Sequence, residues 1–256
     1  MKELGFHEEE RVERVCDDLL VGRELSIVLE GAVPWMPKTG VEPPSGVKAI
    51  LEALDSVEKS AIEGAAGGGF GKMLPYLDAG LEEGKVSKFP ELDHITAVAM
   101  PRVFRLARAA LSDELEVVKS CSRSLIGLGV GLSPSADDLL AGFMSALWWI
   151  CKSLGRGMEL ARNVNRAIVT DITGTTLVSQ QVLRCMSVGE TNEAVEGLLE
   201  SVLRGQTQEA KGRVEEVLAI GETSGADTVV GVLLGFKVGL RLIGDPKTTA
   251  LTPRKA

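Results

Sequence analysis

Residues 127–138 read GLGVGLSPSADD, and the apolar run LLAGFMSALWWIC follows directly at residues 139–151. Glycines at three alternate positions allow a tight turn. A proline between two serines is typical of a helix start, with Ser133 or Ser135 as the N-cap and Pro134 in the first turn. The apolar run is too short to span a bilayer, which takes about 20 residues. Residues 139–151 are therefore predicted to form a buried helix.

Helical periodicity extends outward from this stretch over most of the chain. Apolar residues recur at i, i+3, i+4 and i+7 from Val47 to Leu54 and again from Val103 to Ala110, as on the buried face of a helix. The best strand candidate is the run from Leu25 to Leu29. The sequence therefore predicts a mainly-α fold, a multi-helix bundle-like domain with a small strand-containing N-terminal segment. Helices are expected at roughly residues 46–64, 72–83, 93–111, 113–124, 135–154, 156–172, 175–188, 191–204, 207–220 and 226–243.

Composition divides the chain into three parts. Residues 1–45 hold the short strand and a loop with four prolines between positions 34 and 44, which neither a helix nor a central strand tolerates. Residues 46–245 are expected to form the helical domain that carries the Gly/Ser/Asp motifs. Residues 246–256 have little to bury, which predicts a mobile tail.

Charge and composition disfavour several classes of function. The chain has 28 Lys and Arg against 36 Asp and Glu, a net charge of −8, whereas a general nucleic-acid binder needs a basic face. With His7 and His94 as the only histidines, a histidine-based zinc site is nearly excluded. The four cysteines lie far apart, which indicates reduced thiols. Because the N-terminus is charged and no apolar run is long enough for a membrane span, we expect a cytoplasmic protein with no membrane and no nucleic-acid partner.

The glycine-rich helix start at residues 127–138 is a candidate anion site. Backbone N–H groups at a helix N-terminus favour negative charge, so a small anionic metabolite is the expected ligand. The carboxylates of Asp137 and Asp138 would repel such an anion unless a divalent cation such as Mg²⁺ or a basic side chain lies between them and the anion. The alternative is that the stretch only caps a helix entered by a tight turn.

A second stretch, GETSGADTVVG at residues 221–231, repeats this chemistry. It runs from glycine through hydroxyls to an aspartate and into an apolar helix, and ADTVVG aligns with ADDLLA of the first stretch. Two such helices are expected to be neighbours whose starts line one pocket, although unrelated capping is the alternative, since Ser and Asp are common at helix starts. The candidate catalytic residues, and the ligands of any metal, are Asp137, Asp138 and Asp227. The candidate ligand-binding residues here are Gly127, Gly129, Gly131, Ser133, Ser135, Thr223, Ser224 and Gly225.

A third polar segment, DITGTTLVSQ at residues 171–180, lies between these two. Asp171, Thr175 and Ser179 fall at i, i+4 and i+8, which predicts a polar stripe on one helix face. Thr175, Thr176 and Ser179 are therefore candidate ligand contacts in the same pocket. The alternative is that these hydroxyls bond to their own helix carbonyls or face solvent.

Three other features carry weaker signals. The glycine-rich residues 64–72 end in Gly-Lys but lack the spacing of a phosphate-binding loop, so a flexible connection or a lid is expected. His94 has no nucleophile motif near it and is not expected to act as a base. Arg102, Arg105 and Arg108 form a basic stripe that either holds an anion or is solvated, and solvation is favoured.

Together these motifs resemble a family of proteins with a domain of unknown function that includes the AllH-type subunit of oxamate carbamoyltransferase. The family signature is similar to GLGxGLTPSGDDF, from which this chain departs mildly at Ser133, Ala136 and Leu139. The resemblance covers about residues 120–245 and rests on residues 127–142, on Thr175, Thr176 and Ser179, and on residues 223–227.

The resemblance implies a subunit of a system that handles carbamoyl groups in purine catabolism. Such a system exchanges carbamate or carbamoyl phosphate with an amide-bearing acid such as oxamate. The implied partners are other subunits of a carbamoyltransferase complex or further copies of this chain. A carbamoyl phosphate ligand would suit the glycine-rich helix start, with Mg²⁺ or an arginine offsetting Asp137 and Asp138.

Two other classes stay open. One is a Mg²⁺-dependent hydrolase like the ADP-ribosylglycohydrolases, which are also mainly α and hold metal ions with aspartates at helix starts. This chain lacks a matching acidic motif near its N-terminus, which counts against that class. The other is a non-catalytic helical scaffold subunit in which the glycine motifs serve only close helix packing.

Overall fold

The protein is described from a computed structural model, which covers residues 11–16, 18–22, 25–65, 68–82 and 92–244. The chain divides into two compact units, Met1–Met36 and Pro37–Ala256. The mainly-α prediction with a small strand-containing N-terminal segment is confirmed. The boundaries predicted from composition stay predictions, and the expected mobile tail lies outside the described residues.

The first unit contains a three-stranded antiparallel sheet in the order β1-β2-β3, formed by β1 (Val12–Val15), β2 (Asp18–Val21) and β3 (Leu25–Val28). Its register pairs Val12 with Val21 and Asp18 with Val28. The apolar run from Leu25 predicted β3. The sequence does not predict β1 and β2, because four-residue strands that include charged side chains give only a weak periodic signal.

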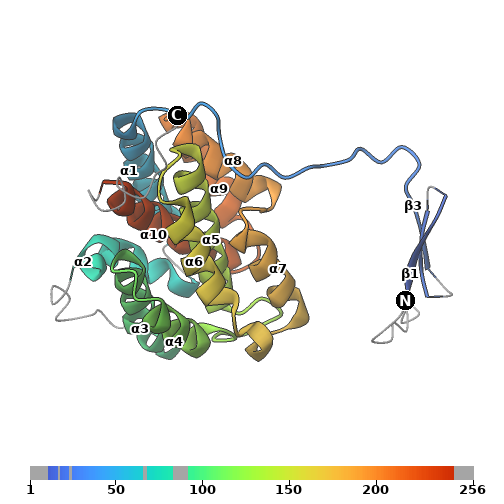
Figure 1. Ribbon diagram of the computed structural model, residues 1–256, viewed down its shortest axis with the longest axis horizontal. Coiled ribbons are helices and arrows are strands. Elements are labelled where there is room, and N and C mark those ends of the chain that lie inside the picture. The colour runs from blue at the N-terminus through green and yellow to red at the C-terminus, as the bar shows by residue number, and fades with distance from the viewer. Residues whose placement is uncertain (1–10, 17, 23–24, 66–67, 83–91, 245–256) are drawn as a thin grey trace. The chain divides into compact units, whose positions relative to one another are not determined.

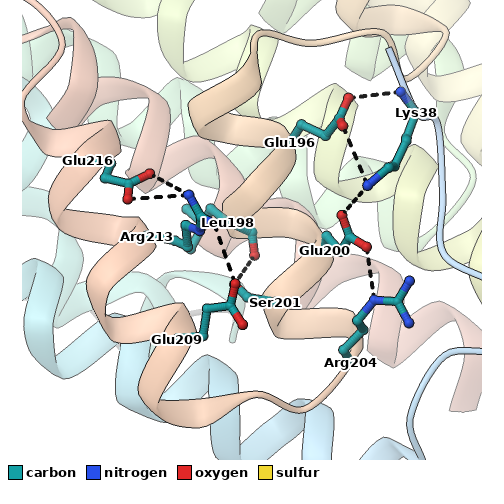
Figure 2. Close-up of polar contacts among 9 residues, drawn as sticks. All are labelled: Lys38, Glu196, Leu198, Glu200, Ser201, Arg204, Glu209, Arg213 and Glu216. Carbon is teal, nitrogen blue, oxygen red and sulfur yellow. Dashed lines mark hydrogen bonds and ion pairs between the residues drawn. The ribbon is translucent and has the colours of Figure 1, made fainter. Parts of the chain in front are cut away.

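The second unit begins with an extended segment, Pro37 to Gly46, that packs along the helices. The Lys38 N–H donates to Glu196, and the Lys38 ammonium pairs with Glu200 at 2.6 Å (Figure 2). Further along, the Val41 N–H donates to the Ser153 hydroxyl at 2.8 Å. The proline-rich loop is therefore ordered over these residues, because side chains of the helices satisfy its backbone donors.

Helices make up most of the described part of this unit after Gly46 (Figure 1). In chain order they are α1 (Val47–Gly64), the 3₁₀ helix η1 (Gly69–Tyr76), α2 (Leu77–Leu81), α3 (His94–Leu111), α4 (Leu115–Leu125), α5 (Ser135–Ser153), α6 (Met158–Val169), the 3₁₀ turn η2 (Ile172–Gly174), α7 (Leu177–Ser187), α8 (Glu193–Leu203), α9 (Thr207–Leu218) and α10 (Ser224–Gly244). The single helix predicted at 72–83 is wrong. A 3₁₀ segment and a short helix replace it, with Pro75, which has no N–H to donate, in the 3₁₀ segment.

The core centres on α5 and α10, which bury nearly all of their side chains against each other and their neighbours. Glycines set their separation: a Cβ atom at Gly231 would overlap the Leu139 carbonyl, and one at Gly235 would overlap the Phe143 carbonyl. Because the contacts advance in the same sense along both helices, α5 and α10 run parallel and begin at the same end of the core.

Within the described residues, no helix combines the length and the hydropathy that a membrane span requires.

Candidate functional site

The parallel packing of α5 and α10 brings the three candidate aspartates together. Asp137 and Asp138 lie in the first turn of α5, and Asp227 lies in the first turn of α10. Their residues are 2%, 8% and 0% exposed, so three carboxyl groups are buried at one end of the core. Buried carboxyl groups need hydrogen-bond donors, and the donors differ among the three.

Asp137 is fully engaged by protein donors. Its Oδ1 accepts the Gly127 N–H at 2.8 Å, and its Oδ2 accepts the Thr175 hydroxyl. Gly127 has a positive φ of 78°, and a Cβ atom there would overlap the Gly174 carbonyl. Asp137 therefore ties the glycine-rich loop, residues 127–133, to the segment that precedes α7.

Asp138 is half engaged, meaning that only one of its two carboxylate oxygens accepts a hydrogen bond. Its Oδ1 accepts the Ser133 hydroxyl, whereas its buried Oδ2 has no hydrogen-bond partner. Burial raises the pKa of Asp138 to about 6, and the negative charge of Asp227 adds to the rise. The hydroxyls of Ser133 and Ser224 act in the opposite direction and lower this pKa. The result is a carboxyl group that changes protonation close to neutral pH.

Asp227 has the same half-engaged pattern. Its Oδ1 accepts the Phe70 N–H at 2.5 Å, and its buried Oδ2 has no partner. Burial raises the pKa of Asp227, while the Phe70 N–H and the hydroxyls of Ser135 and Thr223 lower it. Ser135 of α5 lies near enough to Asp227, and Ser224 of α10 near enough to Asp138, to lower the pKa of the carboxyl group on the other helix, although neither hydroxyl forms a hydrogen bond with its unpartnered Oδ2.

The 3₁₀ helix η1 also contributes to the site, which the sequence does not predict. A Cβ atom at Gly69 would overlap the Asp227 carboxylate, so only glycine lets this backbone approach closely enough for the Phe70 N–H to bind. The sequence feature that marks this segment is the glycine-rich stretch 64–72, which predicts a flexible connection or a lid. Its described residues from Gly69 onward form a 3₁₀ helix against the site, and residues 66 and 67 lie outside the described part.

The predicted polar stripe of Asp171, Thr175 and Ser179 on one helix face is wrong. η2 interrupts the chain after α6, and α7 begins only at Leu177. Thr176 is the N-cap of α7, where its side chain accepts the Ser179 N–H at 3.1 Å and its hydroxyl donates to the Leu132 carbonyl at 2.7 Å. The Ser179 hydroxyl is buried without a partner. Thr175 and Thr176 therefore hold the glycine-rich loop in place.

The predicted cap of α5 is also wrong. Pro134 occupies the N-cap position, Ser135 is the first helical residue, and no side chain caps the helix. The hydroxyls of Ser133 and Ser135 face Asp138 and Asp227 instead, because a buried carboxylate is a stronger acceptor than a neutral group and recruits the nearest hydroxyls.

The remaining candidate glycines have mainly structural roles. A Cβ atom at Gly225 would overlap the Val217 carbonyl, and one at Gly129 would overlap the Ser135 backbone nitrogen. Gly131 has a positive φ of 94° with open space around it. Close packing and turn geometry account for all three without a ligand.

A hollow of about 250 Å³ lies beside the start of α10. Thr223, whose hydroxyl acts on Asp227, lines it together with Gly68 and Glu222. Asp138 and Asp227 are not among its lining residues. In the described part of the chain, no three His, Cys, Asp or Glu side chains gather as a metal site would require. The predicted role of these aspartates as Mg²⁺ ligands therefore stays a prediction.

Residues 125–236, which include every candidate site residue predicted from the sequence, match the model of a protein family described as oxamate carbamoyltransferase subunit AllH. The resemblance inferred from the motifs is thereby confirmed over this stretch. No solved structure matches the chain.

Proposed function

We propose that this chain is a subunit of an oxamate carbamoyltransferase-type enzyme and that it binds the carbamoyl-bearing substrate where α5 and α10 begin. The family match supports the first part of the proposal. One observation carries the second: Asp138 and Asp227, on different helices, each keep a buried Oδ2 without a donor. Buried polar atoms are nearly always hydrogen-bonded, so this pair favours a ligand that supplies donors.

A carbamoyl or amide group has the required chemistry, because its NH₂ offers two N–H donors to two acceptors. The glycine-rich sequence indicates an anion site at the start of α5, but the observed hydrogen bonds make this helix start less suited to an anion. The N–H groups of Ala136 and Asp137, the second and third residues of α5, already donate to the carbonyls of Leu128 and Pro134. Among the described residues, no basic side chain is a recorded partner of the three aspartates. The structure therefore favours the NH₂ end of oxamate or carbamoyl phosphate as the part held by Asp138 and Asp227.

The two half-engaged aspartates also suit proton transfer. A group acts best as a general base when its pKa lies near the working pH, and Asp138, with a pKa of about 6, meets this condition. When the carbamoyl group passes from carbamoyl phosphate to an amide nitrogen, a C–N bond forms, the bond between the carbamoyl carbon and the phosphate oxygen breaks, phosphate leaves with the bonding electrons, and the nitrogen loses a proton. We assign this proton to Asp138, with Asp227 as the second acceptor that orients the nitrogen.

The test is calorimetric titration of the purified chain with oxamate and with carbamoyl phosphate, each with and without Mg²⁺. Asp138→Asn and Asp227→Asn should each weaken binding by about tenfold or more, because each replaces an acceptor by a donor-bearing amide. Asp171→Asn is the matched control, since Asp171 is a more exposed aspartate paired with Arg123. Absence of binding to the wild-type chain, alone and in its assembled complex, would refute the proposed site.

A non-catalytic scaffold role is the second candidate function, favoured by the glycines that set the close packing of α5 and α10. Full activity of a complex assembled with the Asp138→Asn and Asp227→Asn variants would support it. In that outcome, the subunit assignment would stand and the proposed substrate site would not.

A further inference from the structure

We infer a second binding site, for a small organic anion, in the pocket between α2, α3 and α4. The pocket has a volume of about 460 Å³, within the range of about 300–1,000 Å³ that is usual for small-molecule sites. Its wall combines cationic and hydroxyl donors from Arg105, Arg108 and Ser112 with apolar surface from Leu81 and Val117. A donor-rich wall beside an apolar wall fits a carboxylate or phosphate attached to an apolar group.

The two arginines are placed to act together. Arg105 and Arg108 are three residues apart on α3, so they lie on one face of the helix. One N–H of Arg108 donates to the Gly80 carbonyl at 2.6 Å, which fixes its guanidinium at the wall, and its other donors have no partner among the described residues. Arg105, within the described part of the chain, has no hydrogen bond and no ion pair. A free guanidinium beside a fixed one is the arrangement that binds an oxyanion through several N–H groups.

Arg102 lies one turn before Arg105 in the same stripe but has a different role. It donates to the Ser124 carbonyl at 3.2 Å and does not line the pocket. The sequence alone favours solvation for all three arginines of the stripe. In the structure, the three arginines of the stripe differ, because Arg105 and Arg108 line the pocket and Arg102 does not. Arg102 is therefore a matched control for Arg105.

Glu114 is the carboxylate in the pocket wall and opposes an anion. It is exposed, precedes α4, and makes no side-chain capping hydrogen bond. No ion pair joins it to Arg105 or Arg108 among the described residues, so the guanidinium donors are not occupied by it. Because the Glu114 carboxylate lies in the pocket wall, we expect that removing its negative charge strengthens anion binding.

This pocket is separate from the start of α5 and α10. Asp93, the N-cap of α3, lies near enough to Asp227 to raise its pKa, so α3 begins beside the first site. At a rise of 1.5 Å per residue, Arg105 lies about 18 Å and Ser112 about 28 Å beyond Asp93 along α3. The inference therefore does not depend on the proposed carbamoyl site.

The experiment is calorimetric titration of the full chain with phenyl phosphate, with benzoate, inorganic phosphate and phenol as further arms. Phenyl phosphate or benzoate should bind at one site per chain, and the tighter of the two identifies the anionic group that the pocket prefers. Inorganic phosphate should bind more weakly because it lacks the apolar part, and phenol should not bind because it lacks the charge.

Three variants locate the binding. Arg105→Gln should raise the Kd about tenfold, Arg102→Gln should change it less than about twofold, and Glu114→Gln should lower it about threefold. All three positions are at least partly exposed, so each variant is expected to fold. The inference is overturned if the wild-type chain shows no saturable binding up to about 10 mM of either probe, or if Arg105→Gln and Arg102→Gln have equal effects.

Discussion

Two adjacent aspartates at the start of α5 belong to different regions of the molecule. On the α7 side, Asp137 accepts hydrogen bonds on both carboxylate oxygens, from the Gly127 N–H and the Thr175 hydroxyl. On the α10 side, Asp138 faces Asp227, and each keeps one oxygen without a donor. Consecutive helical residues point about 100° apart, which is why one chain position separates a structural contact from a candidate reactive one.

The same aspartate side chain stabilises or destabilises the fold according to the hydrogen-bond donors that reach it. A buried carboxylate with its full set of donors contributes to stability, whereas one with an unmatched oxygen costs free energy. On the α7 side, Asp137 is therefore expected to hold the glycine-rich loop in place. On the α10 side, Asp138 and Asp227 are expected to keep acceptors available for a ligand, which lowers the free energy of unfolding of the ligand-free protein.

The largest expected effect tests the packing that creates both regions. Gly231→Ala should destabilise the protein by about 3 kcal/mol or more, because its Cβ atom would overlap the Leu139 carbonyl and force α5 and α10 apart. Gly212→Ala, in α9 with open space around it, should instead stabilise by about 0.5–1 kcal/mol. Urea unfolding of the two variants checks the difference, and equal stabilities would contradict the glycine contacts described here.

The next largest effect is on the α7 side. Asp137→Asn keeps the shape of the side chain but exchanges charge-assisted hydrogen bonds for neutral ones, so a loss of about 2 kcal/mol is expected. The measurement is the free energy of unfolding at neutral pH without ligand. A variant as stable as the wild type would show that Asp137 does not tie the loop to the segment before α7.

Asp138→Asn is expected to have the opposite sign. Because the folded pKa of Asp138, about 6, lies above its ordinary 3.8, ionising this group costs folding free energy. The cost is fully present above about pH 6 and is relieved as the pH falls toward 4. At pH 8 or so, the variant should therefore be more stable than the wild type by about 1–2 kcal/mol.

The pH dependence distinguishes this explanation from a general effect of the substitution. The stability advantage of Asp138→Asn should shrink between about pH 7 and pH 5, because the wild-type carboxyl group takes up a proton over that range and no longer carries a buried charge. Unfolding curves at the two pH values provide the test. An advantage that is independent of pH would disprove the raised pKa as its cause.

The smallest effect concerns the loop between the two regions. Gly131 has a φ of 94° and no atom near its missing Cβ, so Gly131→Ala meets strain without a clash. A loss of about 1 kcal/mol is expected, measured as a small decrease in Tm. A loss as large as that of Gly231→Ala would indicate a packing contact and not backbone strain.

Sequence patterns predicted the helices well where periodicity was long, as in α1, α3 and α5. They failed where the local backbone depends on distant contacts. Thr175 and Ser179 were expected on one helix face, yet η2 and the N-cap at Thr176 divide the segment, and Thr175 is committed to Asp137. Similarly, Gly69 lies in a flexible-looking stretch, and only its approach to Asp227 explains why a glycine is needed there.

The amino-acid sequence is enough to predict the helical class, the apolar bodies of α5 and α10, and their acidic first turns. These are local properties, set by hydrophobic periodicity and by the chemistry of helix starts. Tertiary contacts are needed to tell which aspartate is fully hydrogen-bonded, which two aspartates share a site, and which arginines reach a cavity. Those distinctions depend on the donors that residues distant in sequence supply, such as Phe70 for Asp227, and no local pattern encodes them.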